Sequence, residues 1–259
     1  MDEDEWEPLA DQFVSGHYGS IRGRVRTHVI DRHLREHLPP PPGRIVDVGG
    51  GAGHQSLPLA RAGYDVTIVD PSPAMLARAE QLIALEPPEV SRRITLVEAS
   101  GEDASRVLDS RFSAVLCHGV VMYLDDPTLM LDSLCELARP GGVVSIVAKN
   151  VEVMAVLPAL AGDWETALAA FSNDHQINGL GVETRGDRRE ALAAMLVDRQ
   201  VDPIAWYGVR LFTDGWTPDR VELGADDIVF AVEYEASRRD PYRQLSRLFH
   251  LLGRRIESE

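Results

Sequence analysis

The sequence of 259 residues has little cysteine, no long apolar run and no signal-like start. Its two cysteines, Cys117 and Cys135, stand in apolar contexts. That pattern is typical of small buried residues in a reducing compartment and not of a disulfide framework. The longest apolar stretches stay below 18 residues, and the first residues are acidic, so neither a membrane span nor a signal peptide is expected. These absences favour a cytoplasmic globular protein with no membrane partner.

Basic residues are also scarce, since 26 Lys and Arg face 41 Asp and Glu, for a formal net charge of −15. Such a balance argues against a large nucleic-acid footprint, although it leaves a local one open. His33 and His37 are four residues apart, but the other histidines are scattered, and the sequence contains neither the H-E-x-x-H nor the C-x-x-C motif of metal ligands. We therefore expect no metal site.

What the sequence does contain is a glycine-rich stretch, R-I-V-D-V-G-G-G-A-G, at residues 44–53. Its apolar start, Ile45 to Val48, predicts a buried strand. The glycines allow a sharp turn and a close approach of the backbone to a ligand. The apolar residues from Leu57 to Ala62 then predict a helix, whose first N–H groups face the turn. Strand, glycine turn and helix together indicate a nucleotide-binding corner.

The spacing of the glycines distinguishes between nucleotides. The dinucleotide motif G-x-G-x-x-G fails, because His54 or Ser56 stands where the third glycine belongs. Instead, Asp47, Gly49, Gly51 and Gly53 form D-x-G-x-G-x-G, which resembles the first motif of class I S-adenosylmethionine-dependent methyltransferases. An acid such as Asp47 would help hold the ammonium end of that cofactor, directly or through water. The alternative is a glycine turn without a ligand.

A second strand and an acid support the cofactor interpretation. Residues 64–69 alternate as a strand and end at Asp70, which lies 17 residues after Gly53. A carboxylate at such a strand end accepts hydrogen bonds from ribose hydroxyls. The alternative role for Asp70, which precedes Pro71-Ser72-Pro73, is that of a turn or capping residue.

Three further strands are expected at residues 94–98, 112–117 and 143–148, and each ends next to polar residues. Gly101 after the third would allow close approach of adenine, with Glu102 or Asp103 accepting from its amine; Asp103 serves equally well as a helix cap. His118 after the fourth strand is either a cofactor contact, a base or a packing residue. Asn150 follows the fifth. Ligands bind at the carboxyl ends of strands in such sheets.

The N-terminal part predicts a helix over 21–38 with a basic face at Arg22, Arg24, Arg26, Arg32 and Arg35. That face is either solvated or lets Arg26 bind a carboxylate, such as that of S-adenosylmethionine. Residues 151–171 are apolar and read as helical; residues 172–189 form a polar loop with glycines. A helix is expected at 189–199. Residues 204–212 and 228–233 are expected to form either two further strands or a strand and the start of a helix. Arg210 lies in an apolar stretch and needs a carboxylate partner from the protein or a substrate.

We therefore expect an α/β, Rossmann-like class I methyltransferase fold, with a mostly parallel seven-stranded sheet, helices on both faces and an N-terminal helical cap. One domain would span residues 1–259. Its parts are a cap at 1–42, an S-adenosylmethionine-binding core at 43–150, a lid or substrate insertion at 151–190, and a C-terminal sheet and helix at 191–259.

Over residues 8–250 the chain resembles the tRNA 5-carboxymethoxyuridine methyltransferase family, which converts that wobble carboxylate to a methyl ester. The segments that carry the resemblance are F-V-S-G-H-Y-G-S-I-R-G-R-V-R (13–26), D-V-G-G-G-A-G, C-H-G-V-V-M-Y-L-D-D-P (117–127), R-P-G-G, G-V-R-L-F-T-D (208–214) and E-A-S-R-R-D-P-Y-R-Q-L-S-R-L-F-H (235–250). The pattern departs at Met122-Tyr123, where the family has an acid and Trp. The resemblance implies cofactor contacts at Arg26, Gly50, Gly51, Asp70, Gly101, Glu102 and His118.

Two functions follow as alternatives. In the first, the acceptor is a carboxylate, such as that of the tRNA nucleoside; it is ionised at neutral pH and needs a cation, for which Arg210 is the first candidate. In the second, a small molecule with a hydroxyl or carboxylate is methylated, and a hydroxyl would need His118 or His17 as base. A third interpretation is a cofactor-binding protein without catalysis. The predicted substrate-side residues are His17, Tyr18, Tyr123, Asn150 and Arg210.

The arginines near the two ends of the chain favour tRNA, because phosphate contacts come mostly from such residues. They are Arg22, Arg24, Arg26, Arg238, Arg239, Arg243, Arg247, Arg254 and Arg255. The alternative is that the C-terminal arginines form the polar face of an amphipathic helix bearing Leu245, Leu248 and Phe249. Whether the protein is a monomer or a homodimer stays open.

Overall fold

The fold is built on a seven-stranded sheet, seen in a computed structural model that describes residues 8, 18–108, 111–215 and 226–257. The strand order is β3-β2-β1-β4-β5-β9-β8, and every pair is parallel except those formed by β9. The strands are β1 (Arg44–Val48), β2 (Asp65–Asp70), β3 (Ile94–Glu98), β4 (Phe112–His118), β5 (Ala138–Lys149), β8 (Val201–Val209) and β9 (Leu248–Arg255). This arrangement confirms the expected fold class. The order reverses direction between β1 and β4, which is where ligands bind in open α/β sheets.

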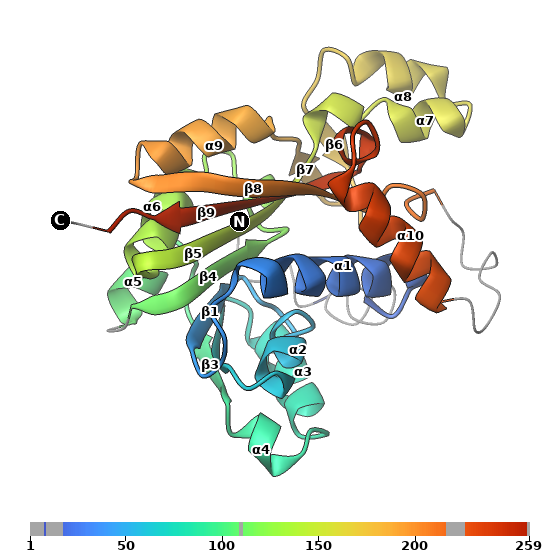
Figure 1. The fold of residues 1–259 in the computed structure, drawn as a ribbon. Coiled ribbons are helices and arrows are strands. Elements are labelled where there is room, and N and C mark those ends of the chain that lie inside the picture. Colours follow the sequence, from blue (N-terminus) through green and yellow to red (C-terminus); the bar gives the residue numbers. More distant parts are fainter. Residues whose placement is uncertain (1–7, 9–17, 109–110, 216–225, 258–259) are drawn as a thin grey trace.

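Helices cover both faces of the sheet (Figure 1). They are α1 (Ile21–His37), α2 (Ser56–Arg61), α3 (Pro73–Ile83), α4 (Pro88–Ser91), α5 (Ala104–Val107), α6 (Thr128–Leu137), α7 (Val156–Leu160), α8 (Trp164–Ala169), α9 (Arg189–Val197) and α10 (Asp226–Arg238). Short 3₁₀ turns are η3 (Val121–Tyr123), η4 (Val151–Val153) and η6 (Tyr242–Leu245).

Alternation of side chains along the strands divides the core into two layers. In β1, Val46 and Val48 face a cluster that includes residues of α6 and α9, whereas Ile45 faces a cluster that includes residues of α1, α2 and α3. In β9, the neighbours Leu248 and Phe249 belong to opposite clusters. Strands that are buried on both faces read as continuous apolar runs, which explains why these segments were recognisable in the sequence.

The C-terminal segment differs from one of its sequence interpretations. The amphipathic helix over Leu245, Leu248 and Phe249 was wrong, because Leu248 begins β9, which pairs antiparallel with both β5 and β8. Leu245 lies in η6 instead. Apolar residues at 248, 249, 251 and 252 suit a two-faced buried strand as well as a helix, so the sequence pattern alone did not distinguish them. The open alternative at 228–233 is resolved as a helix, α10.

The segment after β5 also differs from its expectation. One long helix was expected over 151–171, but η4, α7 and α8 are separate short elements. The polar loop contains an antiparallel hairpin of β6 (His175–Ile177) and β7 (Glu183–Arg185). The R-P-G-G segment at 139–142 is part of β5, which starts at Ala138 opposite Phe112.

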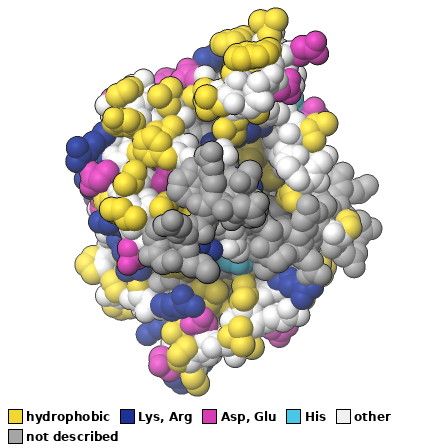
Figure 2. All heavy atoms as spheres, turned by 90° about the vertical axis from the view of Figure 1, so that its right-hand side faces the viewer, with side chains coloured by type: hydrophobic (Ala, Val, Ile, Leu, Met, Phe, Trp, Pro, Cys, Tyr) yellow, Lys and Arg dark blue, Asp and Glu magenta, His cyan; other side chains and the backbone are white. Residues whose placement is uncertain are grey.

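Exposed apolar side chains gather on α7 and α8. Leu160, Trp164 and Leu168 are at least 70% exposed, and yellow side chains are prominent at the top of the face in Figure 2, where these helices lie. In the described part of the chain, no helix is both long and apolar enough to cross a membrane.

Candidate active site

The carboxyl ends of the five consecutive parallel strands place the predicted polar residues along one edge of the sheet. Gly49 follows β1, Asp70 ends β2, Gly101 follows β3, His118 ends β4 and Lys149 ends β5. The register pairs Asp70 with Glu98 and His118 with Val147, so these strand ends are level with one another. The topology therefore brings together residues spread over a hundred positions.

The glycine turn depends on the absence of side chains. Gly49, Gly51 and Gly53 have φ values of +69°, +52° and +80°, which side chains rarely allow. A Cβ at Gly49 would lie 2.4 Å from Cγ2 of Val120. The N–H of Gly49 donates to the carbonyl of Val69 on β2 over 2.7 Å. The turn is thus held against the neighbouring strand in a conformation that leaves no room for larger residues.

Asp70 is fixed by two backbone hydrogen bonds. Its Oδ2 accepts from the N–H of Gly51 at 2.8 Å, and its Oδ1 accepts from the N–H of Ser72 at 3.0 Å. Burial raises the pKa of this carboxyl, and the two backbone hydrogen bonds oppose that rise. Each carboxylate oxygen has further lone pairs for ribose hydroxyls. The turn role and the ribose role are therefore compatible, and the ribose role stays a prediction.

Asp47 lies beneath the glycine turn. Its Oδ2 accepts from the hydroxyl of Ser56 at 2.7 Å, and a Cβ at Gly50 would come within 2.9 Å of its Cγ. Burial raises its pKa to about 6. Asp47 thus bonds the start of α2, and its contact with the cofactor ammonium stays a prediction.

Arg26 joins the N-terminal helix to the end of β4. Ser20 caps α1 by accepting from the N–H of Gly23, which sets the start of that helix. Arg26, one and a half turns later, is 4% exposed and donates from Nη2 to the carbonyl of His118 at 2.8 Å. Its Nη1 donates to the hydroxyl of Tyr18 at 3.1 Å. A buried cation thus stands beside the glycine turn, as the carboxylate-binding hypothesis requires.

Two aromatic rings complete this corner. The ring of Tyr18 stacks on His54 with centroids 4.0 Å apart. Burial and nearby Arg26 lower the pKa of His54 to about 4, so this ring is neutral at pH 7. Predicted substrate residue Tyr18 therefore contacts the cofactor corner itself. His17, predicted with it, lies outside the described residues.

Gly101 packs tightly at the end of β3, since a Cβ there would lie 2.4 Å from Cε of Met130 and 2.8 Å from Cγ1 of Val48. Glu102 follows it and is partly exposed. Asp103 stands at the predicted N-cap position of α5, but its carboxylate bonds the side chains of Ser100 and Arg106 and makes no capping hydrogen bond to the helix backbone. The adenine contacts at Gly101 and Glu102 stay predictions.

Arg210 has a carboxylate partner within the protein. Its Nη2 pairs with Oδ1 of Asp214, while Oδ2 of the same carboxylate lies 3.8 Å from Nε of Arg247. Glu233 of α10 shapes the intervening turn by accepting from the backbone N–H of Leu211 and of Thr213. Nε of Arg210 and Nη1 of Arg247 are buried and have no hydrogen-bond acceptor among the described residues. Two guanidinium groups therefore share one carboxylate and keep donors for another.

Lys149 adds a third cation to this region, and it is the only lysine in the sequence. It is 3% exposed and donates from Nζ to the hydroxyl of Thr184 at 2.9 Å. Burial, followed by the charge of Arg247, lowers its pKa to about 8. We call Lys149, Arg210, Arg247 and Asp214 the cationic cluster. It lies where β5 and β9 pair, because β5 ends at Lys149, whose register partner Leu248 follows Arg247.

The insertion at 151–190 contacts both parts of the site. Asn178, between β6 and β7, donates from Nδ2 to the hydroxyl of Tyr123 at 3.4 Å, and burial raises the pKa of that hydroxyl to about 12. Gln176 accepts from Arg247 at 2.7 Å. Asn150, predicted to bind substrate, uses its side chain to bond the carbonyls of Gln244 and Ser246 and the N–H of Glu152. In this structure Asn150 holds the chain around the site together.

Three members of the cluster were missed as site residues by sequence reasoning. A lone lysine at the end of a buried strand was a usable signal for Lys149. Asp214 and Arg247 offered none, because they lie 33 residues apart and meet only when β8 and β9 pair.

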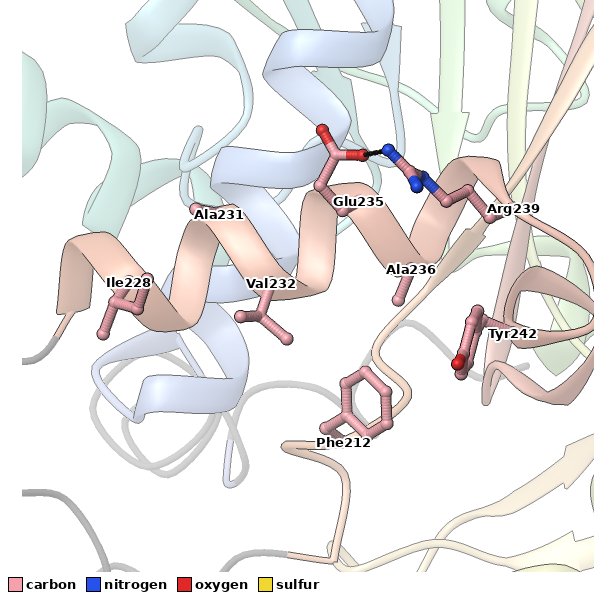
Figure 3. Close-up of a pocket in the computed structure, with 8 residues that line it drawn as sticks. All are labelled: Phe212, Ile228, Ala231, Val232, Glu235, Ala236, Arg239 and Tyr242. Atoms are coloured by element: carbon pink, nitrogen blue, oxygen red, sulfur yellow. Dashed lines mark hydrogen bonds and ion pairs between the residues drawn. The ribbon is translucent and has the colours of Figure 1, made fainter.

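Two hollows adjoin this edge of the molecule. One of about 660 Å³ is lined by Arg210, Asp214 and Arg247 together with apolar residues of α7. The other, of about 490 Å³, lies along α10, where Figure 3 shows Phe212 and Tyr242 beside the helix and an ion pair between Glu235 and Arg239. The first hollow has an excess of positive charge, whereas the charges lining the second cancel.

Comparison with known proteins agrees with this geometry. Residues 46–146, which contain the glycine turn, Asp70, Gly101 and His118, match the methyltransferase-domain family. The chain is an S-adenosylmethionine-dependent methyltransferase.

The similarity of this methyltransferase to other proteins extends beyond the matched domain. It is 26% identical to the tRNA 5-carboxymethoxyuridine methyltransferase of Escherichia coli (strain K12), over 100% of this chain and 99% of that protein. In structure it is similar to the CcbJ methyltransferase from Streptomyces caelestis, with a TM-score of 0.68, 14% identity and complete coverage of both chains. It is also similar to the glycopeptide N-methyltransferase MtfA complexed with S-adenosylmethionine (TM-score 0.58, 16% identity, 89% and 94% coverage). The structural likenesses show the fold.

Proposed function

We propose that this methyltransferase forms a methyl ester on a carboxylate, and that the carboxylate belongs to 5-carboxymethoxyuridine at the wobble position of tRNA. The observation that carries the proposal is the cationic cluster. It holds three cations and a single carboxylate in a largely buried place beside the cofactor edge. Buried charge of one sign is costly unless a partner compensates it. An anionic acceptor supplies that partner.

The chemistry requires little beyond positioning. One carboxylate oxygen attacks the sulfonium methyl, the new O–CH₃ bond forms as the S–CH₃ bond breaks, and the bonding pair stays on sulfur. A carboxylate is already ionised at neutral pH, so no proton has to be removed. Holding the two reactants in line supplies much of the reduction in barrier. In this proposal Nε of Arg210 and Nη1 of Arg247 are the donors that hold the acceptor, with Lys149 next to them.

The histidine at the site supports a carboxylate over a hydroxyl acceptor. A hydroxyl would need a base with a pKa near the working pH. The pKa of His118 is held well below its usual value by burial, by neighbouring His250 and by Arg26. An imidazole in that state is a weak proton acceptor, so His118 is a poor base for the hydroxyl alternative.

The tRNA part of the proposal is supported by similarity over the full length to an enzyme named for that substrate. The arginines that favoured tRNA do not strengthen it, because several are paired within the chain. Arg24 pairs with Asp226, Arg239 with Glu235 and Arg243 with Asp240. The insertion at 151–190, which touches Tyr123 and Arg247, is proposed to line the acceptor site.

The test measures transfer of labelled methyl from S-adenosylmethionine to tRNA that carries 5-carboxymethoxyuridine. The control is tRNA whose wobble base lacks the carboxymethyl group, and a second arm offers an RNA-free metabolite extract. Label in the carboxylated tRNA alone, released by mild alkali as methanol, is expected from an ester. Label confined to the metabolite extract would refute the tRNA acceptor, and alkali-stable label would refute the ester.

A matched pair of variants tests the cluster. Arg247→Met removes one guanidinium but keeps an unbranched side chain, and is expected to lower kcat/KM for the tRNA about tenfold or more, since a charged hydrogen bond to the acceptor is lost. Arg188→Met removes an exposed arginine that pairs with Glu152, and is expected to leave kcat/KM unchanged. Equal activity of the two variants would contradict the role of the cluster.

A further inference from the structure

Five buried side chains form one continuous line of hydrogen bonds from the site into the protein. Nε2 of His118 lies 2.8 Å from the hydroxyl of Ser145, which lies 2.7 Å from Nε2 of His250. Nδ1 of His250 lies 3.2 Å from Nδ1 of His33, and Nε2 of His33 lies 2.8 Å from the hydroxyl of Ser237. All five are buried. They come from β4, β5, β9, α1 and α10, on the face of the sheet that α1 covers.

The far end of this line gives it a direction. The hydroxyl of Ser237 lies 2.6 Å from the carbonyl of Tyr234, which can only accept, so Ser237 donates there. Ser237 must then accept from Nε2–H of His33. A neutral imidazole has one donor and one acceptor, so Nδ1 of His33 accepts from Nδ1–H of His250. Nε2 of His250 in turn accepts from Ser145, and Ser145 accepts from Nε2–H of His118.

Neutrality of the three rings follows from their surroundings. Burial lowers the pKa of each, to about 3 for His250, and the cationic side chains of Arg26, Arg32 and Arg238 and the other histidines lower them further. In this direction, an imidazolium at His33 or His250 would place an N–H against another donor, and one at His118 would leave a buried Nδ1–H without an acceptor among the described residues. Each ring therefore keeps one proton.

The reverse direction is less favourable. It would make Ser237 donate to His33, giving up the bond to the carbonyl of Tyr234, and would place a proton on Nδ1 of His118. That nitrogen is buried and has no hydrogen-bond partner among the described residues. A buried N–H without an acceptor is costly, and one hydrogen bond fewer adds to the cost.

We propose that Ser145, His250, His33 and Ser237 are positioning residues that lock His118 in the Nε2–H tautomer, so that its Nδ1 always presents a lone pair at the site. The line is closed at a backbone carbonyl, which cannot pass a proton on. It therefore fixes a tautomer and does not conduct protons. In this proposal the locked nitrogen accepts from the ammonium of the bound cofactor, the group for which Asp47 is the other predicted contact.

The tautomer is measured directly in the free protein. With ¹⁵N-labelled histidine and backbone-linked assignments, the ring ¹⁵N shifts report which nitrogen carries the proton. The expected pattern is Nε2–H for His118, Nδ1–H for His250 and Nε2–H for His33, at neutral pH. A proton on Nδ1 of His118, on Nε2 of His250, or on both nitrogens of either ring would overturn the proposal. The measurement uses no methyl acceptor, so its result does not depend on the ester or tRNA proposal.

A variant series tests the consequence for the cofactor. Ser145→Ala breaks the line next to His118 and is expected to mix its tautomers and to raise the Kd for S-adenosylmethionine about tenfold, in line with the loss of one hydrogen bond to a charged group. Ser145→Thr keeps the hydroxyl and should restore both the tautomer and the affinity. Ser113→Ala is the control, because it removes a buried serine hydroxyl that bonds the carbonyl of Arg44, outside the line.

A purely structural role for Ser145 would lower stability in Ser145→Ala without altering the ring shifts of His118. The proposal is refuted if those shifts are unchanged in a folded Ser145→Ala protein, or if Ser145→Ala and Ser113→Ala weaken cofactor binding equally.

Discussion

The two halves of the site hold charge in opposite ways. The cofactor half, formed by β1 to β4 and the turns after them, is made of short local segments whose acids accept hydrogen bonds from nearby backbone N–H or hydroxyl groups. Asp70 accepts from Gly51 and Ser72, and Asp47 from Ser56. The acceptor half, formed by β5, β8, β9 and the insertion, gathers Lys149, Arg210 and Arg247 around a single carboxylate.

This difference matches what each half is proposed to bind. S-adenosylmethionine carries its own opposite charges and several hydroxyls, so a neutral and shaped pocket with single acids suits it. A carboxylate acceptor carries one negative charge, and only an excess of cations compensates it in a buried place. Substitutions in the cofactor half should weaken the binding of S-adenosylmethionine, whereas substitutions in the acceptor half should lower activity toward the methyl acceptor.

The largest effect is expected from Gly49→Ala. The substitution combines a φ of +69° with a Cβ placed 2.4 Å from Val120, so the turn must shift. We expect the Kd for S-adenosylmethionine to rise about a hundredfold, since strain and lost backbone contacts add. Titration calorimetry measures it. Gly179→Ala, where a Cβ meets nothing within 4 Å, is the control and should bind normally.

A smaller loss is expected from Asp70→Asn. The amide keeps the size of the side chain but offers one acceptor oxygen in place of two, so we expect the Kd for the cofactor to rise about thirtyfold. The matched control is Asp65→Asn, at the exposed start of the same strand. Unchanged affinity in Asp70→Asn would exclude the ribose contact.

Lys149→Met should act on the other half. We expect kcat/KM for the carboxylated tRNA to fall about tenfold, because a cation near the acceptor is lost, while the Kd for S-adenosylmethionine stays the same. Steady-state kinetics and calorimetry on one preparation give both values. If the variant binds the cofactor weakly but keeps its kcat/KM, Lys149 belongs to the cofactor half and the prediction is wrong.

The smallest effect concerns pH. The pKa of Lys149 is lowered to about 8, chiefly by burial, so its positive charge is present below pH 8 and is lost as the pH rises through that value. Its contribution to acceptor binding should therefore decrease about fourfold between pH 7 and pH 8.5, the change in its protonated fraction. Lys149→Arg, which stays charged, should remove this part of the pH profile. An identical profile would show that another group titrates.

Particular residues show which parts of the structure could be predicted from the sequence. The position of the glycine turn, Asp70 and Gly101 at one edge was predictable, because each lies beside its strand and a parallel sheet brings such strand ends together. Arg210 was expected to need a carboxylate, and Asp214 supplies it four residues later. The C-terminal strand was misread, and the hairpin at 175–185 was missed, because short apolar or polar runs do not distinguish helix, strand and loop.

The roles of the histidines show the same limit. His118 was singled out by its place after β4, but nothing in the sequence connects it with His250 or His33, which lie 132 and 85 positions away. Their line exists only because β9 inserts beside β5 and α1 packs across them.

The sequence by itself determined the fold class and the cofactor, since periodic apolar runs, glycines and strand-end acids act within a few residues of one another. The tertiary structure alone decided the cationic cluster and the histidine line. Both are sets of side chains from separate elements, and electrostatic and hydrogen-bond partners are chosen by distance in space, which chain order does not encode.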